Sequence, residues 1–214
     1  MREKEPSTRV IFVRHGETDF PVDRIYCDAV EDPALNDTGL SQAADIADFL
    51  SDVAFDTALC SSSKRTRMTA EAIASRHPGL NIRHSDMLQE RRFGVWEGMY
   101  FSDIEAGYPD EYRAWKRDQA GFKPQAGESV FDLSDRVLGV LQAKIDEHRG
   151  KTLLFVSHVG PIRVLVCQAL GLPLEKYRQL RIDPASATCV DYGVRQNNLV
   201  YLNYHRRHGP NIND

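Results

Sequence analysis

The chain has 214 residues, of which 42% are hydrophobic and 27% are charged, and its formal net charge is −4. This composition is ordinary for a globular protein with room for one large core, and no apolar run approaches the roughly 18 residues that a membrane span needs. The acidic net charge argues against nucleic acid and against a membrane surface as partners, so any basic site has to be local.

Cysteine usage and the first residues of the sequence indicate the compartment. Residues 1–6 are charged and precede no apolar segment of the kind found in secretory signals. Cys27, Cys60, Cys167 and Cys189 form no C-x-x-C pair, and Cys60 and Cys167 lie in apolar stretches. We therefore expect a reducing, cytoplasmic location without structural disulfides.

Hydrophobic periodicity predicts alternating strands and helices in the first half of the chain. The four β-prone residues Val10–Val13 predict a strand that is buried on both faces. The elements expected after it are a loop over residues 19–37, a helix from Gly39 to about Ser51 capped by Thr38, a strand over 57–60, a helix from the serine cluster 61–63 to about Ser75, and a strand over 81–83. The apolar face of the first helix is expected to contain Leu40, Ala43, Ala47 and Leu50.

The second half repeats the pattern. In chain order we predict a loop over residues 88–99, short helices near 102–106 and 110–118, a loop over 121–127, an amphipathic helix over 129–147, a buried strand over 152–156, a buried helix over 162–170 ended by Gly171, and strands over 187–192 and 198–204 joined by a turn near Gln196. No repeat or Pro/Gly-rich linker divides the chain, so we predict a single domain over residues 1–214. The alternation predicts a three-layer α/β/α sandwich with a mostly parallel central sheet and a small helical cap insertion at about 99–128.

Three of the predicted strands end in polar, basic turns. Arg14 and His15 follow the first, residues 61–65 (SSSKR) follow the second, and His158 follows the third. Because parallel strands end at the same edge of a sheet, these turns can converge there. Arg65 lies in the first turn of its helix, where it opposes the macrodipole at a cost of about 0.3–1 kcal/mol, and a bound anion would remove that cost. We therefore predict an anion site that includes Arg65.

Three further cations, Lys64, Arg67 and Arg163, also lie at predicted helix starts. Each either faces the same anion or points into solvent, and the sequence leaves both interpretations open.

Two histidines, two arginines and a carboxylate around an anion suit phosphoryl transfer. Arginine forks bind phosphate oxygens, and a neutral imidazole can attack phosphorus to form a covalent phospho-enzyme. A protonated carboxyl group then gives its proton to the leaving alkoxide. Glu90 is the best candidate for this acid by a small margin, because Glu17 has an alternative role in tying down its loop and Glu97 can pair with Arg91 or Arg92.

Four motifs in this order resemble the histidine phosphatase superfamily, in its phosphoglycerate-mutase-like branch. They are RHGET at residues 14–18, SSSKRTRMTA at 61–70, LQE followed by FGVWEG at 88–98, and VSHVGPIR at 156–163. The resemblance extends from residue 9 to about 192. The residues that follow the third motif, together with GES at 127–129, look more like the α-ribazole phosphatase and broad-specificity phosphatase groups than like mutases.

The resemblance implies a metal-independent phosphatase without a cofactor, acting on a small phosphorylated metabolite. It implies that His15 attacks the phosphoryl group to form phosphohistidine, and that Glu90 protonates the leaving group and later activates water. The residues that it assigns to catalysis are His15, Glu90, Arg14, Arg65 and His158. The residues that it assigns to substrate binding are Arg14, Thr18, Arg65, His158 and Val159. Activity is then expected to be bell-shaped with pH, and a homodimer is compatible with the sequence.

The chain departs from the family pattern in one loop. Pro21 stands where many members have Asn, and Cys27-Asp28 stands where many have Gln-Gly, so two neutral phosphate donors are lost. Val159 replaces a common glycine, a change that keeps the backbone N–H. Alternatives are therefore a phosphoglycerate-mutase-type phosphoryl transferase and an inactive phosphate-binding regulatory module. A zinc hydrolase is a further alternative, disfavoured by the two arginines and by the lack of an H-E-x-x-H spacing.

The insertion contains the aromatic residues Tyr108, Tyr112, Trp115 and Phe122 and the cations Lys116, Arg117 and Lys123. The aromatic residues either line a substrate pocket or pack the cap on the body. The cations either attract an acidic substrate or are solvated.

Overall fold

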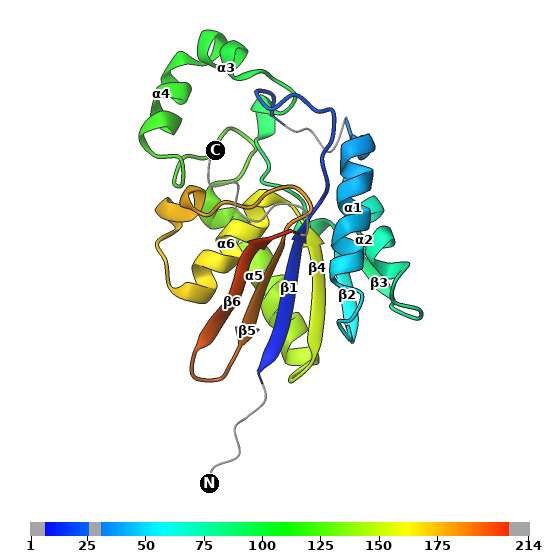
Figure 1. Cartoon of the computed structure of the whole chain (residues 1–214). Coiled ribbons are helices and arrows are strands. Elements are labelled where there is room, and N and C mark those ends of the chain that lie inside the picture. The colour runs from blue at the N-terminus through cyan, green and yellow to red at the C-terminus, as the bar shows by residue number, and fades with distance from the viewer. Residues whose placement is uncertain (1–6, 26–30, 206–214) are drawn as a thin grey trace, which may run out of the picture.

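Strands and helices alternate along the chain, as the sequence predicts (Figure 1). The computed structural model describes residues 7–25 and 31–205. Its strands are β1 (Thr8–Arg14), β2 (Thr57–Ser61), β3 (Ile82–Ser85), β4 (Thr152–Ser157), β5 (Ala187–Tyr192) and β6 (Asn197–Tyr204). Its α-helices are α1 (Asp37–Phe49), α2 (Lys64–Ala74), α3 (Phe101–Gly107), α4 (Pro109–Arg117), α5 (Val130–Glu147) and α6 (Val159–Leu170). Short 3₁₀ turns cover Asp86–Leu88, Gly94–Trp96 and Leu174–Gln179.

The strands of the described residues form one sheet in the order β3-β2-β4-β1-β5-β6. β3, β2, β4 and β1 run parallel, while β5 is antiparallel to β1 and β6 to β5. Arg14 pairs with Ser157 at the end of β1 and β4, and Cys60 pairs with Val156 at the end of β2. The polar turns after these three strands therefore emerge side by side, which confirms the predicted convergence.

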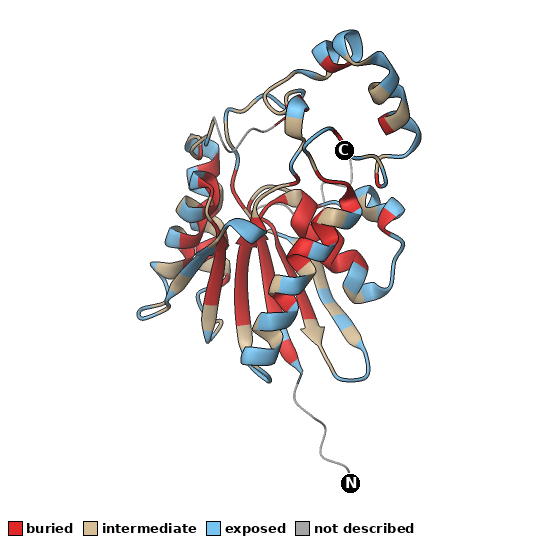
Figure 2. Cartoon of the chain, turned by 180° about the vertical axis from the view of Figure 1, so that it is seen from behind, coloured by how far each residue is buried: buried red, intermediate tan, exposed pale blue. Residues whose placement is uncertain are grey.

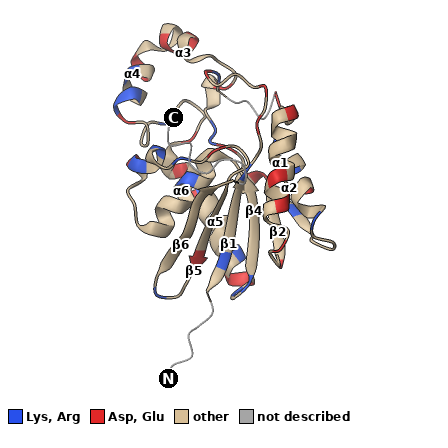
Figure 3. Cartoon of the chain, viewed as in Figure 1, with Lys and Arg blue, Asp and Glu red and all other residues tan. Residues whose placement is uncertain are grey.

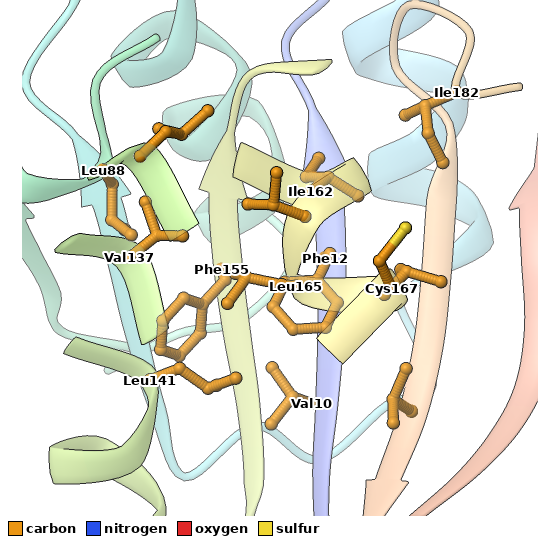
Figure 4. Packing of buried hydrophobic residues seen from close by; sticks show 14 of the residues in the cluster. Val10, Phe12, Leu88, Val137, Leu141, Phe155, Ile162, Leu165, Cys167 and Ile182 are labelled. Carbon is orange, nitrogen blue, oxygen red and sulfur yellow. The ribbon is translucent and has the colours of Figure 1, made fainter. Parts of the chain in front are cut away.

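The two faces of the sheet carry separate apolar layers. Val10 and Phe12 of β1 pack in a cluster with residues of α5 and α6, whereas Ile11 and Val13 pack in a cluster with residues of α1 and α2. This alternation is the two-residue period of a strand that is buried on both faces. Figure 4 shows the first cluster, where Phe12 lies beside Phe155 with ring centroids 5.8 Å apart. Figure 2 shows that the buried surfaces of these helices face the sheet. The three-layer α/β/α sandwich is thus confirmed.

Helices α3 and α4 lie beyond the carboxyl ends of the strands (Figure 1) and form a small core of their own. Trp115 is 6% exposed, and it packs edge-on against Trp96, which also stacks on Phe122. For Trp115 and Phe122 the packing interpretation is therefore correct. Lys123 pairs with Asp132 at 3.0 Å.

Two predicted helix starts are wrong. Asn36, and not Thr38, caps α1, because its side-chain oxygen accepts a hydrogen bond from the Gly39 N–H at 2.8 Å. The buried stripe of α1 accordingly contains Ile46, while Leu40 is 48% exposed. Helix α6 begins at Val159, three residues early, since Pro161 lies in the first turn where no amide donor is needed.

The end of α6 and the turn between β5 and β6 lie at or close to the positions predicted from the sequence. Gly171 adopts the left-handed conformation, with φ of 64°, directly after α6, as expected. The turn between β5 and β6 covers residues 193–196, slightly earlier than predicted. Within the described part of the chain, no helix has the length and apolar character to cross a membrane.

Candidate functional site

His15 lies at the end of β1 with its ring orientation fixed by two contacts. Its Nδ1 is 2.7 Å from the Gly16 carbonyl oxygen, and its Nε2 is 3.3 Å from Nε of Arg65. An arginine nitrogen only donates, so Nε2 has to be the acceptor and Nδ1 carries the proton. The lone pair of Nε2 therefore points toward the arginine, at the position where an anion would bind.

The surroundings keep His15 neutral. Burial, and then the positive charges of Arg65 and Arg14, lower its pKa well below 6.5, although the hydrogen bond to Gly16 works in the opposite direction. At neutral pH the imidazole is thus a free base.

Arg65 joins the two histidines. Its side chain is fully buried in the first turn of α2, and its Nη2 lies 3.0 Å from Nδ1 of His158. The other nitrogen of His158, Nε2, is 2.8 Å from the Ser61 hydroxyl. Burial, followed by the charge of Arg65, lowers the pKa of His158 well below 6.5. Both nitrogens of His158 are occupied, so its predicted role as a phosphate ligand requires one of these contacts to be exchanged.

Gly16 and Thr69 explain how α2 and β1 are joined locally. The Gly16 N–H donates to the Thr69 hydroxyl at 3.1 Å, and that hydroxyl donates to the Arg65 carbonyl at 2.9 Å. A Cβ on Gly16 would lie 2.6 Å from the carbonyl oxygen of Gly39, so only glycine permits this approach to α1.

Glu90 lies at the amino-terminal end of α6, the helix that His158 precedes. Its Oε2 accepts a hydrogen bond from the Gly160 N–H at 3.1 Å, and its Oε1 accepts one from the Arg91 N–H at 2.8 Å. The other two candidate acids are engaged elsewhere. Glu17 is exposed and accepts from the Asn36 side chain, and Glu97 accepts from the amides that begin the 94–96 turn. The geometry therefore favours Glu90.

The remaining predicted binding residues are Arg14, whose charge acts on His15 and His158, and Thr18 and Val159. Arg14 donates to the Ile182 carbonyl at 2.8 Å through Nη1. The Thr18 hydroxyl accepts from the Phe20 N–H at 3.4 Å. Val159 is the first residue of α6, so its N–H has no partner within the helix.

Of the three additional cations, Lys64 and Arg67 are exposed, as in the solvent interpretation. Arg163 is half-buried and its Nε donates to the Leu180 carbonyl at 2.8 Å, so its side chain does not simply point into solvent. Figure 3 shows positive charge near the start of α6 and at the end of α4.

Asp32 is a site residue that the sequence did not reveal. Its carboxylate accepts two contacts from the Lys64 N–H, at 2.7 and 2.9 Å, and it lies 3.8 Å from Nη1 of Arg65. An anion does occupy the start of α2, as the opposing cations indicate, but here it is a side chain. The only sequence feature that pointed toward Asp32 is the presence of several Asp residues in the 19–37 loop. Pro21 is exposed, whereas Cys27 and Asp28 lie outside the described residues.

Among the described residues, no group of three or more His, Cys, Asp or Glu side chains is arranged to hold a metal ion. A cavity of about 640 Å³ lies between α5, α6 and the turn after β5, and it contains none of the residues above. The assignment rests on the side-chain chemistry at the strand ends.

A family model for the histidine phosphatase superfamily (branch 1) matches residues 10–205. The chain belongs to this superfamily. Phosphoserine phosphatase 1 of Hydrogenobacter thermophilus is 33% identical over 196 residues, which cover 91% of this chain and 92% of that protein. An Escherichia coli protein named "Probable phosphoglycerate mutase" is 33% identical over 189 residues, covering 86% of this chain and 85% of its own length. The crystal structure of the alpha-ribazole phosphatase from Shigella flexneri has a TM-score of 0.83 and 30% identity, covering 92% of this chain and 96% of that one. The resemblance of the four motifs is confirmed.

Proposed function

We propose that this histidine phosphatase hydrolyses small phosphate monoesters through a phosphohistidine on His15. The observation that carries the proposal is the neutral His15, whose Nε2 lone pair faces the guanidinium of Arg65. The names of the phosphoserine and alpha-ribazole phosphatases support a small phosphorylated metabolite as substrate.

In the first step, Nε2 of His15 attacks phosphorus and the bond to the ester oxygen breaks. Arg14 and Arg65 offset the charge on the phosphoryl oxygens, which is the largest effect that such a site supplies. Glu90, in its protonated form, gives its proton to the leaving alkoxide. The products of this step are an alcohol and phosphohistidine.

In the second step, a water attacks the phosphohistidine. The Glu90 carboxylate takes the proton from that water, the N–P bond breaks, and inorganic phosphate leaves. The carboxyl group is thereby protonated again and His15 is neutral, as each was at the start.

We infer the cytoplasm as the location. The buried free thiols of Cys60, Cys167 and Cys189 support a reducing compartment. Cell fractionation tests this, and recovery with secreted proteins would contradict it. We propose a small phosphorylated metabolite as the partner of the protein, with neither nucleic acid nor a membrane, and a homodimer is compatible with the sequence.

Covalent labelling tests the mechanism. The protein is mixed with a ³²P-labelled substrate, quenched, and split between acid and base. We expect label on His15 that is lost in acid and kept in base, and we expect none in His15→Ala. The control is His84→Ala, on exposed β3, which should label normally. Hydrolysis by His15→Ala at the rate of the unchanged protein would overturn the mechanism.

Two further arms separate the alternatives. Activity that survives exhaustive chelation removes the metallohydrolase, and clear labelling removes the inactive module. A panel containing phosphoserine, 3-phosphoglycerate, fructose 2,6-bisphosphate and nucleoside 5′-phosphates, ranked by kcat/KM, separates phosphatase from mutase. Isomerisation of 3-phosphoglycerate faster than release of phosphate from any ester would favour the mutase.

A further inference from the structure

A buried ion pair lies behind Glu90, and the mechanism above does not use it. Glu128 is 8% exposed and Arg136, on α5, is 9% exposed. We call them the Glu128–Arg136 pair. Their contact is bidentate, since Nε and Nη2 of Arg136 lie 2.8 Å from Oε1 and Oε2 of Glu128. Charged groups this deeply buried are costly unless their whole bonding capacity is used.

The remaining bonds of Arg136 go to the segment that carries Glu90. Nη1 donates to the carbonyls of Met87 and Gln89 at 2.8 and 3.1 Å. Nη2 donates to the carbonyl of Glu90 at 3.2 Å. The three bonds to these carbonyls and the two bonds to Glu128 together use all five N–H groups of the Arg136 guanidinium. One side chain thus holds three carbonyls within four residues of chain.

The bond to the Glu90 carbonyl also orients the Glu90 side chain. That carbonyl belongs to the peptide unit between Glu90 and Arg91, and the N–H of the same unit donates to Glu90 Oε1 at 2.8 Å. A peptide unit is planar, so fixing its carbonyl fixes the direction of its N–H. The carboxyl group is then held between this N–H and that of Gly160.

Glu128 is fixed in turn from its other side. It accepts a hydrogen bond from the Arg92 N–H at 3.1 Å, and the Arg92 side chain approaches Oε1 at 2.9 Å. Burial alone would raise the pKa of Glu128, but hydrogen bonds from Arg136 and from the Arg92 N–H bring it below the ordinary value. The pair is therefore charged at neutral pH.

We propose that Arg136, oriented by Glu128, is a positioning residue that holds Glu90 where it can protonate the leaving group. This inference rests on the proposed function, in which Glu90 is the acid. If Arg136 has this role, its loss slows the hydrolysis of esters whose leaving group needs a proton. The hydrolysis of esters whose leaving group needs no proton is then little affected. An alkoxide needs the proton, whereas p-nitrophenolate is a stable anion that leaves without it.

The experiment compares kcat/KM for the best alkyl phosphate of the panel with kcat/KM for p-nitrophenyl phosphate. General acid catalysis contributes about 10²–10⁴-fold, so we expect Arg136→Met to lower the alkyl-to-aryl ratio by about 30-fold or more. Arg136→Lys keeps the buried charge but replaces the fork with one compact donor, and we expect an intermediate ratio. Because both substrates are measured on one sample, the ratio does not depend on the fraction of protein that is folded.

Arg9→Met is the matched control. It removes another bidentate arginine–carboxylate pair, with Asp191 at 2.7 and 2.8 Å, but Arg9 lies at the start of β1, at the opposite end of that strand from His15, so the ratio should stay within about twofold of the unchanged protein. Glu90→Gln removes the acid itself and should give the largest decrease in the alkyl-to-aryl ratio. Adding Arg136→Met to Glu90→Gln should therefore lower the ratio no further.

Three results would overturn the proposal. They are an equal loss on both substrates in Arg136→Met, an unchanged ratio in both Arg136 variants, and a further loss of ratio in the Glu90→Gln background. An unchanged protein that hydrolyses neither ester would instead refute the proposed function.

Discussion

At the scale of single residues, the site depends on two imidazoles that stay neutral because they are buried beside arginines. His15 and His158 lie with ring centroids 5.2 Å apart, edge to face, and Arg65 contacts both. This arrangement leaves His15 unprotonated, as its proposed role of nucleophile requires. It also makes the folded protein sensitive to acid.

We predict that the free energy of unfolding decreases as the pH falls below 6.5. Each histidine takes up a proton near that pH in the unfolded chain, whereas in the folded chain its pKa is lowered well below 6.5. The unfolded state then binds more protons, so acid favours unfolding, by about 1.4 kcal/mol per pH unit for each histidine. Above pH 6.5 the two histidines are neutral in both the folded and the unfolded state, so they no longer lower the free energy of unfolding. Urea unfolding at several pH values measures the slope.

A single substitution isolates one of the two contributions. His15→Gln should reduce the slope between about pH 5 and 6 by about 1.4 kcal/mol per pH unit. His84→Gln, on the exposed surface of β3, serves as the control and should leave it unchanged. An identical slope in His15→Gln would contradict a lowered pKa for His15.

The sequence is a good guide to which residues meet at the strand ends and a poor guide to what they touch. The strand-end pattern and the motifs indicate His15, Arg65 and His158, because these positions follow from strand periodicity. The contacts of His158 with Ser61 and of Asp32 with the start of α2 were not predictable. They depend on how loops far apart in the chain fold back on the sheet edge.

At the scale of elements, the start of α6 is shaped to receive the Glu90 carboxyl group. A Cβ built on Gly160 would lie 2.1 Å from Oε1 of Glu90 and 3.3 Å from a methyl carbon of Leu133. The carboxylate is the mobile end of a side chain, so it would move while the backbone stays. Helix α6 therefore tolerates only glycine here if the acid is to keep its place.

We predict that Gly160→Ala lowers kcat/KM for alkyl phosphates by at least about tenfold while the protein stays folded, since general acid catalysis contributes about 10²–10⁴-fold. Gly139→Ala, in α5, is the control, because its Cβ would meet nothing within 4 Å. Its helix should become more stable by up to about 1 kcal/mol, with activity unchanged. Steady-state kinetics measures kcat/KM, and thermal unfolding measures the stability of each variant. Full activity in Gly160→Ala would show that the carboxyl position does not matter.

Element boundaries were predicted less well than the elements themselves. The interior of α1 follows from its apolar spacing, but its start is decided by one hydrogen bond, which the Gly39 N–H donates to the side chain of Asn36. Asn and Thr both cap helices, so the sequence does not choose between Asn36 and Thr38. Helix α6 begins earlier than predicted because Pro161 lies inside its first turn, where a proline is tolerated, and does not precede the helix.

At the scale of the whole molecule, the cap has a core that is separate from the two layers on the sheet. The cap core consists of Ile25, Trp96, Ile104 and Trp115, with further aromatic residues around it. A core this small gives little resistance to local opening compared with β1 and β4. The alternative between pocket and packing could not be decided from the sequence, because either role selects aromatic residues.

We predict that Trp115→Ala opens the cap and leaves the sheet intact. Trp115 packs against Trp96, Phe101 and Tyr112, so its loss should speed hydrogen exchange in α3 and α4 but not in β1 and β4. Phe155→Ala, in the main core, is the comparison; it should cost about 3–5 kcal/mol and speed exchange in every slow region. Exchange followed by mass spectrometry distinguishes the two. Equal acceleration of β1 in Trp115→Ala would mean that cap and sheet unfold together.

The position of β1 in the sheet has a consequence for the protein as it is synthesised. Arg9 pairs with Thr152 on one side and with Asp191 on the other. A ribosome that adds about 5–20 residues per second needs roughly 9 to 36 seconds to make the 182 residues that lead from Arg9 to Asp191. During that interval the apolar run that ends at His15 has no partner strands, and it is a natural target for chaperones. A nascent chain therefore cannot assemble this site until almost all of the sequence has been translated.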